Sequence, residues 1–181
     1  NLMPPPNSPW AALNFDLGLE LMGHMSRIAE LPGEEYMFRY YIHDPWYANS
    51  PWHDRYDSQP YDIYLPMALS RIDENGNVIS PTHLNLLTID DSFGNMPDSC
   101  VYEPLPHILK AANEAPDAPS PLVWVYPFKE YNTCKDETLV QEMFFGDWFV
   151  HNAINNGLPL STVVSTDIFC KTDKEIYLSS V

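Results

Sequence analysis

The chain is poor in basic residues and in glycine. Only 9 lysines and arginines stand against 25 aspartates and glutamates, so the formal net charge is -16. A field of this sign repels phosphate backbones and anionic lipid surfaces, and the composition therefore disfavours nucleic acid as a partner. The 7 glycines are outnumbered by 18 prolines, and aromatic residues make up 13% of the chain. This balance indicates ordered loops stiffened by proline rather than disordered linkers.

The sequence also has no cysteine framework and no long apolar run. Its 3 cysteines, Cys100, Cys134 and Cys170, form no CxxC pair, and their odd number disfavours a disulfide scaffold. No apolar stretch approaches the ~20 residues of a membrane span, and no signal peptide is recognisable. We expect a soluble protein whose periplasmic or extracellular location is favoured over a cytoplasmic one. The start at Asn1 and an apolar end suggest a piece of a longer polypeptide.

Several catalytic motifs are absent as well. There is no GxSxG, Walker-type or GxGxxG loop, which disfavours lipase-type, nucleotidase and dinucleotide-binding functions. No cofactor is predicted. What the chain does have is an ordinary hydrophobic fraction of 45%, enough for a packed core.

Predicted strands alternate with predicted helices or long loops. Apolar residues at helical spacing predict helices over residues 15–29, 105–115 and 137–155. Short β-rich runs predict strands over residues 36–42, 84–89, 122–126, 162–165 and 176–181. Residues 63–72 fit either a strand or a helix, because Pro66 interrupts an alternating pattern. The nearly continuous apolar strands are typical of a parallel sheet covered on both faces, which predicts an α/β fold.

Acidic residues follow most of the predicted strands. The pairs are His43-Asp44, Asp90-Asp91, Lys129-Glu130 and, after the strand at 162–165, Asp167. In parallel α/β folds ligands bind outside the carboxyl ends of the strands, so these side chains are expected to converge on one cleft. The alternative is that they are ordinary loop residues and helix caps.

Aromatic residues are concentrated between residues 36 and 64, interleaved with histidines and acids. Sugars need such a mixture, because their C–H faces pack on rings and their hydroxyls need polar partners. The alternative is an aromatic loop packed on the core. The predicted sugar-binding residues are Tyr41, His43, Asp44, Trp46, Trp52, His53, Asp54 and Tyr126.

Glycoside hydrolysis needs two carboxyl groups, one protonated and one ionised. Glu130 is the first candidate, because the aromatic residues around it favour a raised pKa. Asp90 or Asp91 is the second, from an exposed turn before Ser92, and Asp44 is the third. A rival chemistry uses the histidines and aspartates of residues 43–54 as metal ligands, but their spacing matches no established motif and no metal is predicted.

Two stretches resemble a known family. The first, residues 15–131, carries the segments FDLGLELMGHM, YYIHDPW, LNLLTIDDSFGNMPD and PLVWVYPFKEY. It resembles the later part of the (β/α)8 barrel in large bacterial glycoside hydrolase-like proteins, including the β-galactosidase-like group. The second, residues 147–181, carries DWFVHNAINNGLPLSTVVSTD and EIYLSSV, and it resembles the start of the glutamine-amidotransferase-like domain that follows such barrels.

The resemblance implies a division of the chain and an activity. Residues 1–134 are expected to form the C-terminal part of a (β/α)8 barrel, and residues 135–181 the beginning of a flavodoxin-like or amidotransferase-like α/β layer. The implied function is hydrolysis of a glycosidic bond in an oligosaccharide through paired carboxylates. The alternatives are a non-catalytic carbohydrate-binding module and an assembly scaffold of the same fold, whose partners are other parts of a larger polypeptide or a second copy.

Overall fold

The computed structural model of the chain describes residues 17–31, 35–41, 61–87, 102, 104–171 and 178–179. The helices are α2 (Leu17–Ile28), α3 (Tyr61–Met67), α5 (Pro104–Asn113), α6 (Phe128–Thr133), α7 (Glu137–Asn155) and α8 (Thr166–Phe169). The strands are β1 (Met37–Tyr41), β2 (Ser70–Ile72), β3 (Val78–Ile79), β4 (His83–Leu87), β5 (Leu122–Tyr126), β6 (Leu160–Ser165) and β7 (Leu178–Ser179).

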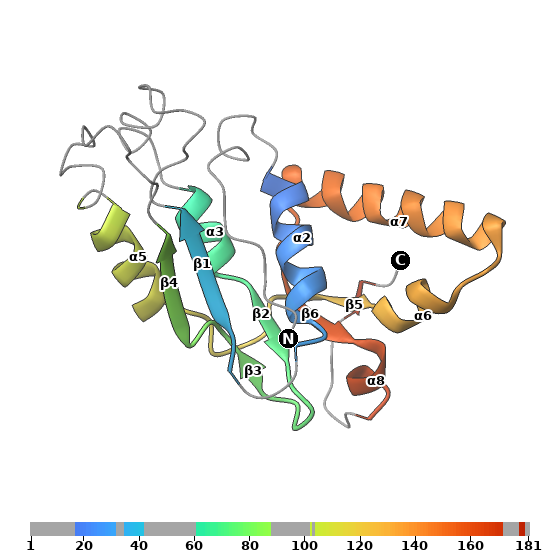
Figure 1. Cartoon of the computed structure of the whole chain (residues 1–181), viewed down its shortest axis with the longest axis horizontal. Coiled ribbons are helices and arrows are strands. Elements are labelled where there is room, and N and C mark those ends of the chain that lie inside the picture. Colours follow the sequence, from blue (N-terminus) through green and yellow to red (C-terminus); the bar gives the residue numbers. More distant parts are fainter. Residues whose placement is uncertain are drawn as a thin grey trace.

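The strands form two sheets. The larger sheet has the order β3-β2-β6-β5-β7, in which β2, β6, β5 and β7 run parallel and β3 returns antiparallel to β2. The smaller sheet pairs β1 with β4 in parallel. Helices lie between and beside these strands (Figure 1). The predicted α/β class is therefore confirmed.

The finer prediction of a partial barrel is not confirmed. In a (β/α)8 barrel each strand neighbours the next strand along the chain. Within the described residues, β6 lies between β2 and β5, and β5 lies between β6 and β7. The predicted division at residue 134 falls between α6 and α7, yet β6 from its C-terminal side pairs with β2 and β5 from its N-terminal side.

The ambiguous segment at residues 63–72 contains both elements. Helix α3 ends at Met67 with Pro66 in its last turn, and the buried strand β2 begins at Ser70. A proline at this position removes one backbone hydrogen bond and its ring crowds the carbonyl group four residues earlier, and the chain leaves the helix just after it. The Asp73–Gly76 turn then leads into β3, with Asp73 Oδ1 accepting from the backbone N–H groups of Asn75 (2.9 Å) and Asn77 (2.7 Å).

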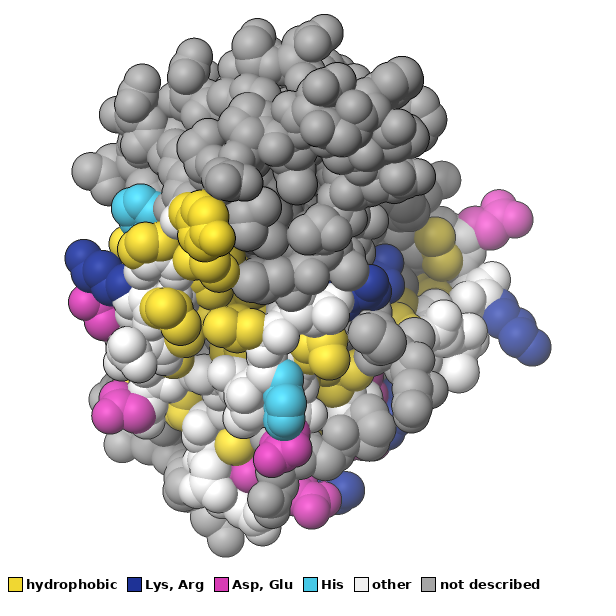
Figure 2. All heavy atoms as spheres, turned by 60° about the vertical axis from the view of Figure 1, so that its left-hand side comes forward, with side chains coloured by type: hydrophobic (Ala, Val, Ile, Leu, Met, Phe, Trp, Pro, Cys, Tyr) yellow, Lys and Arg dark blue, Asp and Glu magenta, His cyan; other side chains and the backbone are white. Residues whose placement is uncertain are grey.

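The smaller sheet has its own packed cluster. Phe38 of β1 packs with Ile63 and Met67 of α3 and with Ile108 and Ala111 of α5, and all five are buried. Three large hydrophobic residues of β4, α5 and the chain before α5 are exposed: Leu84, Tyr102 and Leu109. Figure 2 shows hydrophobic side chains gathered on this face of the molecule. This part of the fold therefore leaves apolar surface in contact with solvent.

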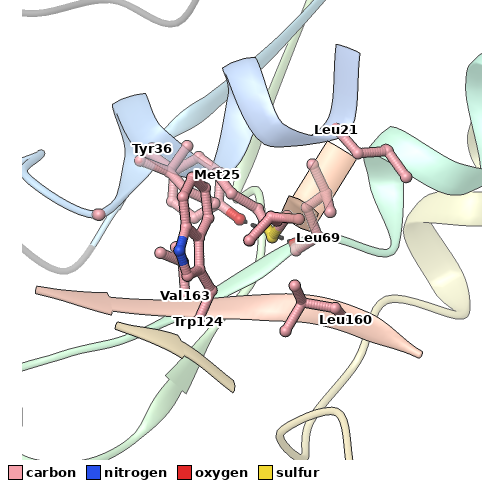
Figure 3. Packing of buried hydrophobic residues seen from close by; sticks show 10 residues of the cluster. Leu21, Met25, Tyr36, Leu69, Trp124, Leu160 and Val163 are labelled. Carbon is pink, nitrogen blue, oxygen red and sulfur yellow. Dashed lines mark hydrogen bonds between the residues drawn. The ribbon is translucent and has the colours of Figure 1, made fainter. Parts of the chain in front are cut away.

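The larger sheet is covered on both faces. Trp124 of β5 and Val163 of β6 pack with Leu21 and Met25 of α2 (Figure 3). Their sequence neighbours Val123 and Val164 point to the other face, where Ile168 and Phe169 of α8 pack. Alternate residues of a strand point to opposite faces, so nearly continuous apolar strands require a cover on each side.

Tyr36 fastens the chain before β1 to the larger sheet. Its ring lies in the same cluster as Trp124, and its hydroxyl donates to the carbonyl oxygen of Leu69 at 3.1 Å (Figure 3). Burial raises the pKa of this phenol, with the Arg71 guanidinium opposing the shift. Arg71 is itself buried and donates to the carbonyl oxygens of Ile28 and Leu31, at the end of α2.

Helices α2 and α7 approach each other closely at Gly18. Its N–H donates to Asn155 Oδ1 at 2.6 Å, so a side chain near the end of α7 satisfies a donor in the first turn of α2. A Cβ at Gly18 would lie 2.4 Å from the backbone oxygen of His151. This crossing therefore requires glycine.

Helix α7 has the bounds that the sequence predicts. Asp136 caps its N-terminus by accepting from the N–H groups of Thr138 (2.9 Å) and Leu139 (3.2 Å). It ends at Asn155, after which Gly157 adopts a left-handed φ of 88°. The long connection from β5 through α7 then returns the chain to β6, directly beside β5.

Candidate functional site

The candidate site lies at the carboxyl ends of β5 and β6. The register pairs Tyr126 with Ser165, the last residues of the two strands. After Tyr126 the chain passes through Pro127 into α6, and after Ser165 it enters α8 directly. Two short helices therefore begin side by side at one edge of the sheet, where ligands bind in parallel α/β folds.

Side chains from these two helices contact each other. Lys129 Nζ forms an ion pair with Asp167 Oδ2, and Thr166 Oγ1 donates to Glu130 Oε1 at 2.8 Å. The ion pair lowers the pKa of Asp167 and raises that of Lys129, in both cases through the hydrogen bond first and the opposite charge second. Two of the acids that follow predicted strands, Glu130 and Asp167, thus lie at the carboxyl ends of the neighbouring strands β5 and β6.

The charges of these residues also act on a third carboxyl group, at the end of α2. Glu30, just after the end of that helix, is half-buried. Burial is the main cause that raises its pKa, and the negative charges of Asp167 and Glu130 add to the shift while Lys129 opposes it. Sequence reasoning did not find Glu30, because about a hundred residues separate it from its neighbours and nothing in its local sequence marks it.

Aromatic rings of β5 and α6 contact one another on both sides of Glu130 in the sequence. The Tyr126 ring lies 4.9 Å from Trp124, 5.5 Å from Tyr131 and 6.0 Å from Phe128, measured between ring centroids. The contact with Tyr131 is edge-to-face. Tyr126, a predicted sugar-binding residue, is half-buried in this stack. These ring contacts hold α6 against β5 and so fix the positions of Lys129 and Glu130 on that helix.

A pocket of about 530 Å³ adjoins Glu130. It lies between the end of β5, α6 and the first turns of α7. Its lining residues are Val125, Pro127, Glu130, Tyr131, Thr133, Cys134, Leu139 and Glu142. The volume is within the range of small-molecule sites, roughly 300–1,000 Å³. The pocket therefore combines apolar walls with two carboxylates from different helices.

Most of the other predicted site residues lie outside the described part of the chain. These are the catalytic candidates Asp90 and Asp91 and the sugar-binding candidates His43, Asp44, Trp46, Trp52, His53 and Asp54. Tyr41 is the last residue of β1 and therefore stands at the carboxyl end of the smaller sheet. Of the predicted residues, Glu130 accepts from Thr166 and lines the pocket with Glu142, whereas Tyr126 contacts Tyr131 and is not part of the pocket lining. Glu30, Asp167 and Glu142 were not assigned a catalytic role from sequence.

Among the described residues, no group of three or more histidine, cysteine, aspartate or glutamate side chains is arranged to hold a metal ion. No helix in this part of the chain has the length and apolar character needed to cross a membrane. Cys134 and Cys170 are both free thiols.

Comparisons of the chain with protein-family models, with curated proteins and with solved structures find no match. The site therefore has to be interpreted from its own chemistry.

Proposed function

We propose that the carboxyl ends of β5 and β6 bind carbohydrate and that the site hydrolyses a glycosidic bond. The observation that carries the proposal is the meeting of α6 and α8 through the Glu130–Thr166 hydrogen bond and the Lys129–Asp167 ion pair, with the Tyr126–Tyr131 ring contact and the pocket on the same helix α6. Glu30 is close enough for the charges of Glu130 and Asp167 to act on its pKa. Carboxylates accept hydrogen bonds from sugar hydroxyls, and rings such as Tyr131 pack against sugar C–H faces.

The raised pKa of Glu30 suits a general acid. A carboxyl group that keeps its proton to higher pH is able to protonate the leaving oxygen of a glycosidic bond. Glu130 is then the ionised partner, acting as base or nucleophile, and Thr166 holds one of its oxygens in place. Asp90 and Asp91 are the alternative partners for Glu130 that the sequence offers.

The resemblance to glycoside hydrolase-like barrels supports the same chemistry. In that view residues 1–134 belong to the end of a barrel and residues 135–181 to the start of an amidotransferase-like layer. This finer description of the fold is part of the proposal. The proposal of a sugar-binding site rests on the contacts around Glu130 and does not depend on this description of the fold.

The second candidate is carbohydrate binding without catalysis. It is favoured by the exposure of Glu130, whose side chain faces solvent. Catalytic carboxyl groups act best where water is excluded, whereas a sugar-binding carboxylate works at an exposed rim.

The test is a screen of glycans and aryl-glycosides against the intact chain and two variants, Glu130→Gln and Glu30→Gln. We expect turnover that falls at least ~10²-fold in each, because each variant removes a proton-transfer group or nucleophile. Glu114→Gln is the matched control, an exposed glutamate after α5 that we expect to leave turnover unchanged. Binding with no turnover in any form would support the non-catalytic alternative, and neither binding nor turnover would overturn the proposal.

A further inference from the structure

The pocket beside Glu130 has a charge that the catalytic proposal does not use. Glu130 from α6 and Glu142 from α7 line the same pocket, and both are exposed. Glu142 lies on α7, outside the group formed by Glu30, Glu130 and Asp167. The pocket therefore presents carboxylates from two different helices to one bound molecule.

No basic residue offsets these two charges. None of the eight lining residues is lysine, arginine or histidine. Lys129, the neighbour of Glu130 in sequence, is held in its ion pair with Asp167. Among the described residues, neither Glu130 nor Glu142 has an ion-pair partner within 4.0 Å. The pocket is therefore negative, in a chain whose net charge is already -16.

The remaining walls are mainly apolar. Val125 and Pro127 stand at the end of β5, Tyr131 on α6 and Leu139 on α7. A ligand that fits needs an apolar face for these side chains and a positive group for the carboxylates. Metal cations lack the apolar face, and anionic sugars are repelled.

We infer that the carbohydrate bound at this pocket carries a free amino group, so that its protonated amine lies between Glu130 and Glu142. The inference rests on the proposed function and names its substrate class, saccharides that contain an amino sugar. An ammonium group has three hydrogen-bond donors and a full positive charge, whereas a hydroxyl group has one donor and no charge. Charge-assisted hydrogen bonds are roughly twice as strong as neutral ones.

Affinity for three matched oligosaccharides tests the inference. We compare an oligomer of glucosamine, the same oligomer N-acetylated, and the corresponding glucose oligomer, each titrated into the intact chain by calorimetry near pH 6. Acetylation removes the charge and keeps the ring. We expect the amine form to bind about 10-fold more tightly than the other two, with an affinity that falls as salt is added.

Glu142→Gln separates charge from shape. We expect it to remove most of the preference for the amine form over the glucose oligomer. Glu137→Gln is the matched control, an exposed acid on the same helix that does not line the pocket. A thermal melt checks that each variant is folded.

The outcomes distinguish the two proposals. Equal affinity for all three oligomers would overturn the inference about the amine and leave the carbohydrate-binding site standing. A preference that survives Glu142→Gln, or that Glu137→Gln removes equally, would overturn the assignment of the amine to this pocket. Binding of no saccharide would overturn both proposals.

Discussion

The middle and the carboxyl ends of β5 and β6 differ sharply in exposure. In the middle, Trp124 is 1% exposed and Val163 and Val164 are 0% exposed. At the ends, the side chains of Lys129 and Asp167 are 59% and 49% exposed. The same two strands thus carry fully buried residues in their middle and lead into the helices α6 and α8, which bear Lys129, Glu130 and Asp167. The buried residues in the middle of the strands have to be apolar and of the right size for packing. The exposed residues at the ends are accessible to a ligand.

Polar groups behave differently in the two regions. Thr162, buried in the middle of β6, is 2.9 Å from the Ser70 hydroxyl and accepts from the backbone N–H of Ser120 at 2.8 Å. Those bonds keep a buried hydroxyl from costing stability. The ion pair at the ends is exposed to solvent, where such pairs contribute little. We therefore expect substitutions in the middle of the strands to lower the free energy of unfolding strongly. Substitutions at the carboxyl ends are expected to change ligand binding instead.

Trp124→Ala is expected to give the largest loss of stability. The substitution removes a fully buried ring from the cluster beneath α2, and large-to-small changes of this kind cost ~3–5 kcal/mol. The free energy of unfolding from urea titration measures it. Trp148→Ala is the matched control, because that ring on α7 is 58% exposed and its loss is expected to cost under ~1 kcal/mol. An equal loss of stability in Trp124→Ala and Trp148→Ala would contradict the difference in burial between the two rings.

His24 is expected to make stability depend on pH. Burial first, and the charge of Arg27 second, lower its pKa from 6.5 to about 4 in the folded chain. Because the unfolded chain binds this proton more readily, the contribution is complete above pH 6.5 and is lost as pH falls toward 4. The loss is roughly 3 kcal/mol. Urea titrations across this pH range measure it.

The variant His24→Gln isolates this group from the carboxylates that titrate nearby. We expect the loss of stability between pH 6.5 and 4 to shrink in the variant. His83→Gln, a change at an exposed histidine, is expected to leave the pH dependence as it is. An unchanged slope in His24→Gln would show that this histidine is not buried as described.

Gly18→Ala is expected to have an intermediate effect. Its Cβ would lie 2.4 Å from the backbone oxygen of His151, so the helices have to move apart, at a cost of ~1–3 kcal/mol. Gly23→Ala, on the same helix, meets nothing within 4 Å and is expected to stabilise by up to ~1 kcal/mol. Thermal melts of the two variants compare them, and the same sign for both would contradict the α2–α7 packing.

Lys129→Met is expected to have the smallest effect on stability. The ion pair with Asp167 is exposed, so its loss leaves the free energy of unfolding unchanged within error. The change acts on Glu30 instead, because Lys129 lowers the pKa of that carboxyl and its removal raises it further. Titration of the Glu30 carboxyl carbon by NMR measures the shift. A downward shift would show that Lys129 does not act on Glu30.

The sequence predicted the elements that local patterns determine. Helix α7 has the predicted bounds because Asp136 and Gly157 mark its ends locally. Strand β5 matches residues 122–126, since five apolar residues stand between two loops. Helices α6 and α8 were not predicted, because each follows its strand without a connecting loop and their short sequences contain strong strand formers.

The candidate site was predictable only in part. Glu130 and Asp167 follow strands, and that position marks them in sequence. The order β2-β6-β5 places α2 over β6, and so brings Glu30 to their edge, but strand order depends on long-range pairing that periodicity does not encode. Glu142 lines the pocket from α7 and Glu130 lines it from α6, and no sequence motif marks this arrangement.

The central claim is that carbohydrate binds at the carboxyl ends of β5 and β6. Backbone amide shifts of the isotope-labelled chain, followed by NMR during titration with the tightest glycan from the screen, test it most directly. We expect the largest shifts at residues 128–131 and 165–167, next to the pocket and the carboxyl group of Glu130. Shifts confined to the exposed rings of α7 at Trp148 and Phe149, with none at these ends, would contradict it.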